Sequence, residues 1–302
     1  PGMIGAGLSY DGTKLYGVDP SGTVNVWSTH DLNEVRRLHH LASDKSVGMV
    51  MSGDGEILLA ADERIITAYN EDTLRHFDYL NTGSRLMDFD LSANAVRAIA
   101  GYHDGQLILW DILGGKLDRV VKTTSKGVKA VAISADAQTY AAAFEGGSVK
   151  IWGSNGYSDP IILETDANSQ PTSLAFSKNG QRLAISGTNT ETRRGYTSVW
   201  DTPFSTHDRV HHVSDTFDSW PFIAISDDGY TMAVSSFRGG TKVWNLRESS
   251  LAHTFDKGGF SVAVSPDGSL VAFTKNYKNI TLLQAETGKT VEVMSEPEPV
   301  RD

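Results

Sequence analysis

Residues 86–122 read LMDFDLSANAVRAIAGYHDGQLILWDILGGKLDRVVK, and the prediction of the fold starts from this stretch. It contains four short runs rich in apolar residues: Leu86–Leu91, Ala95–Ala100, Gln106–Trp110 and Leu117–Lys122. The residues between them form turns: Asn94, His103-Asp104-Gly105 and Gly114-Gly115. Runs of this length between Gly, Asp and Asn indicate short β-strands joined by tight turns, and no stretch of the chain shows sustained helical periodicity.

The first turn of this stretch recurs along the whole chain. Seven copies have an apolar residue, Ser, one further residue and then a turn Asp or Asn: Asp11, Asp54, Asn94, Asp136, Asn179, Asp228 and Asp267. Their separations are 43, 40, 42, 43, 49 and 39 residues. A bulky residue follows 15 or 16 residues later in six copies and 21 later in the fifth, where it is Trp200. This period of about 43 residues predicts seven structural repeats.

Four strands in each of seven repeats predict an all-β fold, a seven-bladed β-propeller with four antiparallel strands per blade. We expect one domain over residues 1–295, with an acidic tail or linker at 296–302. The expected blades are residues 3–43, 44–83, 84–125, 126–169, 170–218, 219–258 and 259–295. The residue directly before each turn Ser is large, such as Ile133, and in most copies the residue before that is small, such as Ala132. This alternation of large and small residues suits sheets that stack face to face.

The turn motif, together with the Trp-Asp pairs Trp110-Asp111 and Trp200-Asp201, resembles the WD-repeat β-propeller family over essentially the whole chain. The family's Gly-His pair is absent, and its Asp six residues before the Trp occurs only as Asp104. The resemblance implies a ring that binds partners on one loop-rich face. It also implies closure by a strand shared between the termini.

This chain departs from that way of closing the ring. It is expected to start on an innermost strand, Met3 to Leu8, and to end on an outermost one, Thr290 to Met294. Each blade would then be self-contained. Closure would rest on packing between blades, or on a latch outside this sequence. Pro1-Gly2 is expected to be a cloning remnant.

Composition excludes several classes of function. The 302-residue chain has a formal net charge of −10, which disfavours a nucleic-acid-binding protein. It has no Cys, and therefore no disulfide, thiol nucleophile or Cys-ligated metal. No apolar run approaches the roughly 18 residues of a membrane span, and no signal peptide is evident. We expect a cytoplasmic protein without a cofactor.

Histidine clusters are weak candidates for a metal site. His207, His211 and His212 have the composition of a ligand set, but adjacent residues on a strand point to opposite faces. This segment is expected to be the outermost strand of the fifth blade, and His39-His40 occupies the equivalent place in the first. We therefore predict no metal site.

Asp88 and Asp90 form a possible charged site. They are two residues apart on an expected innermost strand and so share one face. Two close carboxylates repel each other unless a cation intervenes, which is how acid–base and metal sites are built. The favoured alternative is a structural ion pair, with Arg97 or with a basic residue of a neighbouring blade.

The expected partner-binding face consists of the loops before first strands and between second and third strands. Candidate contacts are the following residues: Arg85, Phe144, Trp220, Phe237, Arg238, Phe260 and Tyr277. Large aromatic and Arg side chains are enriched in binding hot spots. Alternatively, the aromatic rings cap the core. On the same face we expect an inserted polar loop in the fifth blade, Thr188 to Gly195. Its Arg193-Arg194 would either bind a carboxylate or phosphate or be exposed to solvent without a ligand.

These observations favour a non-catalytic interaction scaffold that binds a protein or peptide, as one domain of a larger protein. Two other hypotheses remain open at this point. One is an enzyme or small-molecule sensor that uses the central channel, with Asp88 and Asp90. The other is a regulatory domain that controls an attached effector. No Gly-x-Ser-x-Gly elbow and no phosphate-binding loop support an enzyme.

Overall fold

The structure is a computed structural model, and it describes most of the chain. The described residues are 5–8, 13–18, 23–31, 33–38, 46–52, 57–62, 66–70, 77–79, 83–123, 127–153, 159–163, 165, 168–201, 209–217, 221–236, 238–256, 258–259, 261–275 and 279–295. Within them the chain forms seven antiparallel sheets of four strands each, and no helix. The prediction of an all-β chain is confirmed.

Consecutive strands pair in every sheet, so each sheet is a meander of one repeat. Sheet 1 contains β1 (Gly5–Leu8), β2 (Lys14–Val18), β3 (Val24–Ser28) and β4 (Glu34–Leu38). Sheet 2 contains β5 (Ser46–Met51), β6 (Ile57–Asp62), β7 (Ile66–Asn70) and β8 (Phe77–Tyr79). Sheet 3 contains β9 (Leu86–Leu91), β10 (Arg97–Tyr102), β11 (Gln106–Asp111) and β12 (Lys116–Lys122). Sheet 4 contains β13 (Val128–Ile133), β14 (Thr139–Phe144), β15 (Val149–Gly153) and β16 (Ile161–Leu163).

The last three sheets repeat this order. Sheet 5 contains β17 (Ser169–Phe176), β18 (Arg182–Asn189), β19 (Gly195–Asp201) and β20 (Arg209–Phe217). Sheet 6 contains β21 (Phe222–Ile225), β22 (Thr231–Ser236), β23 (Gly240–Asn245) and β24 (Ser250–Phe255). Sheet 7 contains β25 (Val262–Val264), β26 (Leu270–Lys275), β27 (Asn279–Gln284) and β28 (Thr290–Ser295).

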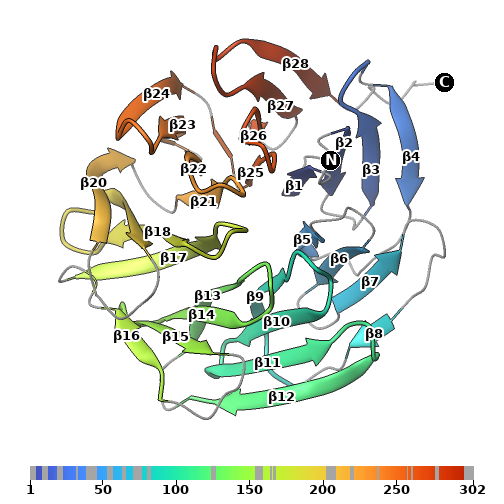
Figure 1. Ribbon diagram of the computed structural model, residues 1–302, viewed down its shortest axis with the longest axis vertical. Coiled ribbons are helices and arrows are strands. Elements are labelled where there is room, and N and C mark those ends of the chain that lie inside the picture. Colours follow the sequence, from blue (N-terminus) through green and yellow to red (C-terminus); the bar gives the residue numbers. More distant parts are fainter. Residues whose placement is uncertain are drawn as a thin grey trace.

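The seven sheets are arranged around a common centre (Figure 1), with the first strand of each sheet innermost. Each first strand contacts the first strand of the next sheet, from β1 to β5 and onward to β25. β25 in turn contacts β1, so that the blue N-terminal strand lies beside the red C-terminal sheet (Figure 1). The first and last sheets therefore meet without sharing a strand between the termini, since β1 to β4 form one sheet and β25 to β28 another.

The hydrophobic core is divided into clusters that lie between consecutive sheets. Between sheets 3 and 4, for example, Ile99 and Leu109 pack with Val131 and Tyr140. Sheets 7 and 1 share such a cluster too, in which Leu15 packs with Ala272, Ile280 and Leu282, among others. No sheet buries both faces alone, so burial of apolar surface depends on the neighbours on each side.

The alternation of large and small residues on first strands has the expected role. In β17, Phe176 and Leu174 face the cluster shared with sheet 4, whereas the small Ala175 faces the cluster shared with sheet 6. In β13, Ala130 and Ala132 likewise face the following sheet, and Val131 and Ile133 face the preceding one. The bulk of one sheet thus fills the space left by small residues of its neighbour.

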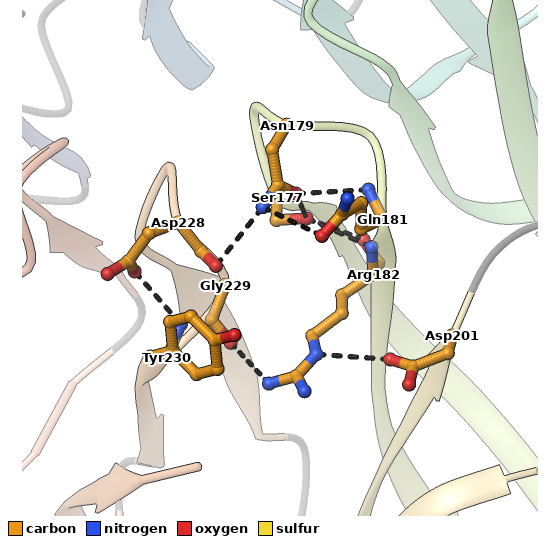
Figure 2. Close-up of polar contacts among 8 residues, drawn as sticks. All are labelled: Ser177, Asn179, Gln181, Arg182, Asp201, Asp228, Gly229 and Tyr230. Atoms are coloured by element: carbon orange, nitrogen blue, oxygen red, sulfur yellow. Dashed lines mark hydrogen bonds and ion pairs between the residues drawn. The ribbon is translucent and has the colours of Figure 1, made fainter. Parts of the chain in front are cut away.

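The recurring turn is held by a buried Ser hydroxyl. In sheet 5, Ser177 Oγ donates a hydrogen bond to Asn179 Oδ1 (2.7 Å) and accepts one from the Arg182 N–H (3.0 Å). Asn179 Oδ1 also accepts from the Gln181 N–H (3.0 Å), and these contacts are drawn in Figure 2. Ser177 is fully buried. Gly180, which follows Asn179, has a φ of +67°, a left-handed conformation that Gly adopts without steric cost.

The same turn also links neighbouring sheets. Figure 2 shows Arg182 extending from sheet 5 toward the turn of sheet 6. Its Nη1 donates to the Gly229 carbonyl (2.8 Å), while its Nε pairs with Asp201 (3.0 Å) in its own sheet. Asn179 Nδ2 donates to the Asp228 carbonyl (3.1 Å). The turn of sheet 5 therefore contributes both to its own sheet and to the contact with the next.

The fifth repeat differs from its expected form. The residues inserted before Trp200 were expected to form a polar loop from Thr188 to Gly195. Instead β18 extends to Asn189 and β19 begins at Gly195, with Thr188 and Gly195 paired across the two strands. The insertion therefore lengthens two strands, because added residues that continue the pairing satisfy their backbone groups. A turn of five residues, 190–194, remains.

Replacing Ser177 with Ala should destabilise the protein by roughly 1 to 3 kcal/mol, because it removes a fully buried hydroxyl and leaves the Arg182 N–H without that acceptor. Urea unfolding followed by circular dichroism measures the change. The matched control is Ser249→Ala in the exposed turn between β23 and β24, which should change stability by less than about 0.5 kcal/mol. Equal effects of the two substitutions would contradict a structural role for the Ser177 hydroxyl.

Candidate functional site

A cavity of about 400 Å³ lies at the centre of the molecule. Its lining comes from the first strands of all seven sheets, from Gly7 in β1 to Val264 in β25. Most of the lining side chains are apolar, such as Met49, Val131 and Phe176. A concave space that is lined by both apolar and polar groups is a type of space in which ligands bind.

Asp88 and Asp90 supply polar groups on one wall of this cavity. Asp88 Oδ2 accepts a hydrogen bond from the Val131 N–H (2.8 Å), and Asp90 Oδ2 accepts one from the Ile133 N–H (2.9 Å). Both donors belong to β13, the first strand of the next sheet. Asp90 Oδ1 also accepts from the Leu91 N–H (2.8 Å). The two carboxyl groups therefore connect sheets 3 and 4.

The environment of the two carboxyl groups disfavours their charged form. Burial raises the pKa of Asp88 to about 7, opposed by the N–H donor of Val131 and reinforced by the charge of Asp90. Burial also raises the pKa of Asp90 to about 7, opposed by the N–H donors of Ile133 and Leu91. Both groups thus titrate near neutral pH, in the range used by general acids and bases.

The expected ion pair between Arg97 and these aspartates is wrong. Arg97 Nε pairs with Asp118 on β12 (3.2 Å), and its Nη1 donates to the carbonyl of Ala137 in the turn of sheet 4 (3.4 Å). Arg97 directly follows the turn of its repeat, in the same place as Arg182 in sheet 5, and makes the same kind of link to the next sheet. Asp88 and Asp90 are instead stabilised by backbone N–H groups.

In sheets 3, 4 and 5, the loop before the first strand lies beside the loop between the second and third strands. The His103 N–H, between β10 and β11, donates to the Arg85 carbonyl before β9 (2.9 Å). In sheet 4 the Glu145 N–H donates to the Gly127 carbonyl (2.8 Å), and in sheet 5 the Thr190 N–H donates to the Asn168 carbonyl (2.9 Å). We refer to this surface, formed by the loops before first strands and between second and third strands, as the loop face.

The predicted contact residues have different positions. Arg85 and Arg238 are exposed on the loop face. Phe144 is not available there, which corrects the prediction: it is 1% exposed and lies edge-on to Trp152, with 6.4 Å between the ring centroids. As the last residue of β14, it points into the cluster between sheets 3 and 4. The remaining candidates lie outside the described residues: Trp220, Phe237, Phe260 and Tyr277.

The turn between β18 and β19 is a fixed feature of the loop face. Asn189 Oδ1 accepts the N–H groups of Glu191 and Thr192 (3.0 Å each), and the Arg193 N–H donates to the Asn189 carbonyl (2.8 Å). Arg193 has a φ of +58°, which a non-Gly residue rarely adopts. Arg193 and Arg194 are both exposed. The guanidinium groups are therefore presented by an ordered turn.

Among the described residues, no group of three or more His, Asp or Glu side chains is placed to hold a metal ion. His211 and His212 lie in β20, the outermost strand of sheet 5 as expected, while His39, His40 and His207 fall outside the described residues. In the same part of the chain no helix is long and apolar enough to cross a membrane.

The sequence did not reveal a second charged pair at the cavity. Lys178 and Asp227 line it from the turns of sheets 5 and 6, with 3.2 Å between Lys178 Nζ and Asp227 Oδ2. Each is the residue directly after a turn Ser, a position that varies among the copies. A comparison of that position across the repeats shows a Lys and an Asp on adjacent blades. These opposite charges were the sequence signal for the pair.

Comparison with known proteins gives one informative similarity. No protein-family model matches the chain. The chain is similar to Autophagy-related protein 16 of Arabidopsis thaliana, with 22% identity over 257 residues. The alignment covers 81% of this chain and 47% of the relative, so the chain spans about half the length of the curated relative that it matches. This similarity and the all-β structure of several sheets fit a WD-repeat-like fold.

Replacing Phe144 with Ala should destabilise the protein by about 3 to 5 kcal/mol, because its ring is buried between two sheets. Replacing the exposed Arg238 with Ala should change stability by less than about 0.5 kcal/mol. Chemical unfolding of both variants measures the difference. A small effect of the Phe144 substitution would contradict its burial and support Phe144 as a surface contact.

Proposed function

We propose that the chain is a seven-bladed β-propeller that serves as a non-catalytic scaffold for a protein or peptide partner, bound on the loop face. The observation that carries this proposal is the set of cores between consecutive sheets, which includes the core between sheets 7 and 1. Such packing makes a rigid support from which connecting loops project, and loops on rigid supports commonly carry binding residues. The similarity to Autophagy-related protein 16 supports a scaffold over an enzyme.

The exposed groups of the loop face suit contact with a protein. Arg85, Arg193 and Arg238 present guanidinium groups from sheets 3, 5 and 6. Arg forms paired hydrogen bonds with carboxylates and stacks on aromatic rings, so it is favoured at interfaces. We further propose Trp220, Phe237, Phe260 and Tyr277 as apolar anchors of the same contact, on the basis of their positions in the repeats.

A second function is favoured by the cavity. Two carboxyl groups whose pKa values burial raises to about 7 line a space of about 400 Å³ with both polar and apolar walls, which suits a small-molecule sensor. A thermal-shift screen of small molecules distinguishes the two functions, since a ligand that binds only the folded chain raises its melting temperature. A stabilising ligand whose effect is lost in Asp88→Asn would favour the sensor.

The scaffold proposal is tested by removing two proposed contacts together, with Trp220→Ala and Arg238→Ala in one chain. This double variant should weaken partner binding by roughly 2 to 4 kcal/mol, because buried aromatic and Arg contacts dominate interface energies. Quantitative affinity capture from extracts of the source cells, with immobilised wild type and variants, identifies the proteins whose retention changes. Titration with the purified candidate then measures the affinity.

The matched control is Lys289→Ala. It removes one exposed cation from the turn between β27 and β28, which belongs to a different set of loops from the loop face. Proteins retained by this control and lost by the double variant would support the loop face. Retention of the same proteins by the double variant, with unchanged affinity, would exclude it.

A further inference from the structure

The first strand of sheet 3 differs from the other six first strands at two positions. The residues four and two positions before its turn Ser are Asp88 and Asp90. In the other copies these positions carry Gly, Val, Ala, Ser or Phe, so that only the pair in sheet 3 is ionisable. Six first strands take their places without a carboxyl group there, and packing therefore does not require the two aspartates.

The two carboxyl groups are held in place and remain accessible from the central cavity. Both side chains are partly exposed, and both line that cavity. Asp88 Oδ2 accepts the Val131 N–H (2.8 Å), and Asp90 Oδ2 accepts the Ile133 N–H (2.9 Å). Hydrogen bonds from N–H donors favour the ionised form of a carboxyl group. The cavity thus has two positioned acceptors of negative charge on one wall.

The spacing of the pair is set by the backbone. Residues two apart on a strand share a face and are separated by roughly 6 to 7 Å along it. The donors Val131 and Ile133 are also two residues apart, on the neighbouring strand β13, so they preserve this spacing at the carboxyl groups. Two negative charges at this separation match two linked positive charges better than one compact cation.

The rest of the wall suits the apolar part of such a ligand. Met49 and Met51 of β5 line the cavity, as do Phe176 of β17 and Phe222 of β21. Apolar side chains favour contact with methylene groups, and aromatic rings also attract cations. The cavity volume of about 400 Å³ is in the range of small-molecule sites.

The other charged side chains near the cavity are already paired. Lys178 and Asp227 are the only other charged residues of the described lining, and they pair with each other at 3.2 Å. Arg97 and Lys129, on strands next to the two aspartates, form ion pairs with other carboxylates. The described wall therefore carries two excess negative charges when both aspartates are ionised.

We propose that the central cavity binds an aliphatic diammonium compound, with one ammonium group at Asp88, the other at Asp90 and the methylene chain against the apolar wall. Each ammonium group would donate to a carboxylate, which is the stronger, charge-assisted kind of hydrogen bond. This inference rests on the small-molecule function proposed for the cavity and adds the chemical class of the ligand. It does not depend on a partner at the loop face.

Calorimetric titration of the whole chain with 1,4-diaminobutane tests the proposal. The extended chain of this compound separates its two ammonium groups by about the spacing of the two carboxyl groups. The titration is made at low ionic strength and at pH 8, above the pKa of about 7 that burial gives both groups. Butylamine and butane-1,4-diol are the matched ligands, because they keep the chain and lack one or both charges.

The diamine should bind at least about tenfold more tightly than butylamine, because each hydrogen bond to a charged group adds affinity, and the diol should not bind measurably. Equal affinities for the diamine and butylamine would contradict a site built for two charges. Binding of the diol as tight as that of the diamine would exclude recognition of charge altogether.

Two variants locate the binding. Asp88→Asn and Asp90→Asn each keep an oxygen acceptor for the neighbouring N–H and remove one charge, so each should weaken diamine binding by about tenfold or more. The matched control is Glu248→Gln, which removes one negative charge from the exposed turn between β23 and β24 and should leave the affinity unchanged. Unchanged affinity in both Asn variants would place the diamine elsewhere and overturn the proposal.

NMR of the wild type gives a readout that needs no variant. The amide signals of Val131 and Ile133 and the methyl signals of Met49 and Met51 should shift as the diamine is added. Shifts confined to other residues would overturn the site. If the diamine does not bind while a neutral or anionic molecule stabilises the wild type but not Asp88→Asn, the diammonium ligand is wrong and the sensor function stands. If no small molecule stabilises the chain, both fail.

Discussion

The packing of each sheet against both of its neighbours is the constraint on which the rest of the structure depends. A four-stranded meander of about 43 residues has two faces, and it cannot bury either alone. In this chain the apolar clusters lie between consecutive sheets, and the cluster around Leu15 and Ala272 brings the last sheet against the first. The positions of the described loops therefore follow from the order of the sheets around the centre.

Hydrogen bonds supplement this packing where the backbone would otherwise lack partners. The buried turn Ser satisfies groups within its own sheet, and Asn179 and Arg182 extend the same turn to the backbone of the next sheet. On the other side of the molecule, Ser186 Oγ donates to the Pro221 carbonyl in the segment that leads to β21 (2.8 Å). Contacts at both ends of the strands restrict how one sheet can rotate relative to the next.

The repeat made the strands of the fold predictable from the sequence. Each strand is short and bounded by residues with a strong turn preference, so local signals were sufficient, and the first strand of sheet 3 was predicted from Leu86 to Leu91 as observed. The fifth repeat was less predictable. Its inserted residues continue the pairing of β18 and β19, and a choice between longer strands and a longer loop depends on partners across the sheet.

The candidate site was only partly predictable, because side-chain partners come from other repeats. Phe144 was expected at the surface from its place near a loop, but the ring of a terminal strand residue turns inward when a neighbour such as Trp152 offers an apolar surface. Arg97, on the strand next to that of Asp88, was one of the two expected kinds of partner for the aspartates. Its guanidinium group instead reaches the turn of the next sheet, a distance along the chain of 40 residues.

Departures from a repeated pattern are informative because the other copies show what the fold alone requires. Ala at the two positions that face the next sheet satisfies the packing in sheet 4, and Ser with Ala satisfies it in sheet 5. The two carboxyl groups at these positions in sheet 3 instead line the central cavity and accept backbone N–H groups of sheet 4. Two carboxyl groups where Ala or Ser suffices in other copies point to a role for this pair beyond what the packing requires.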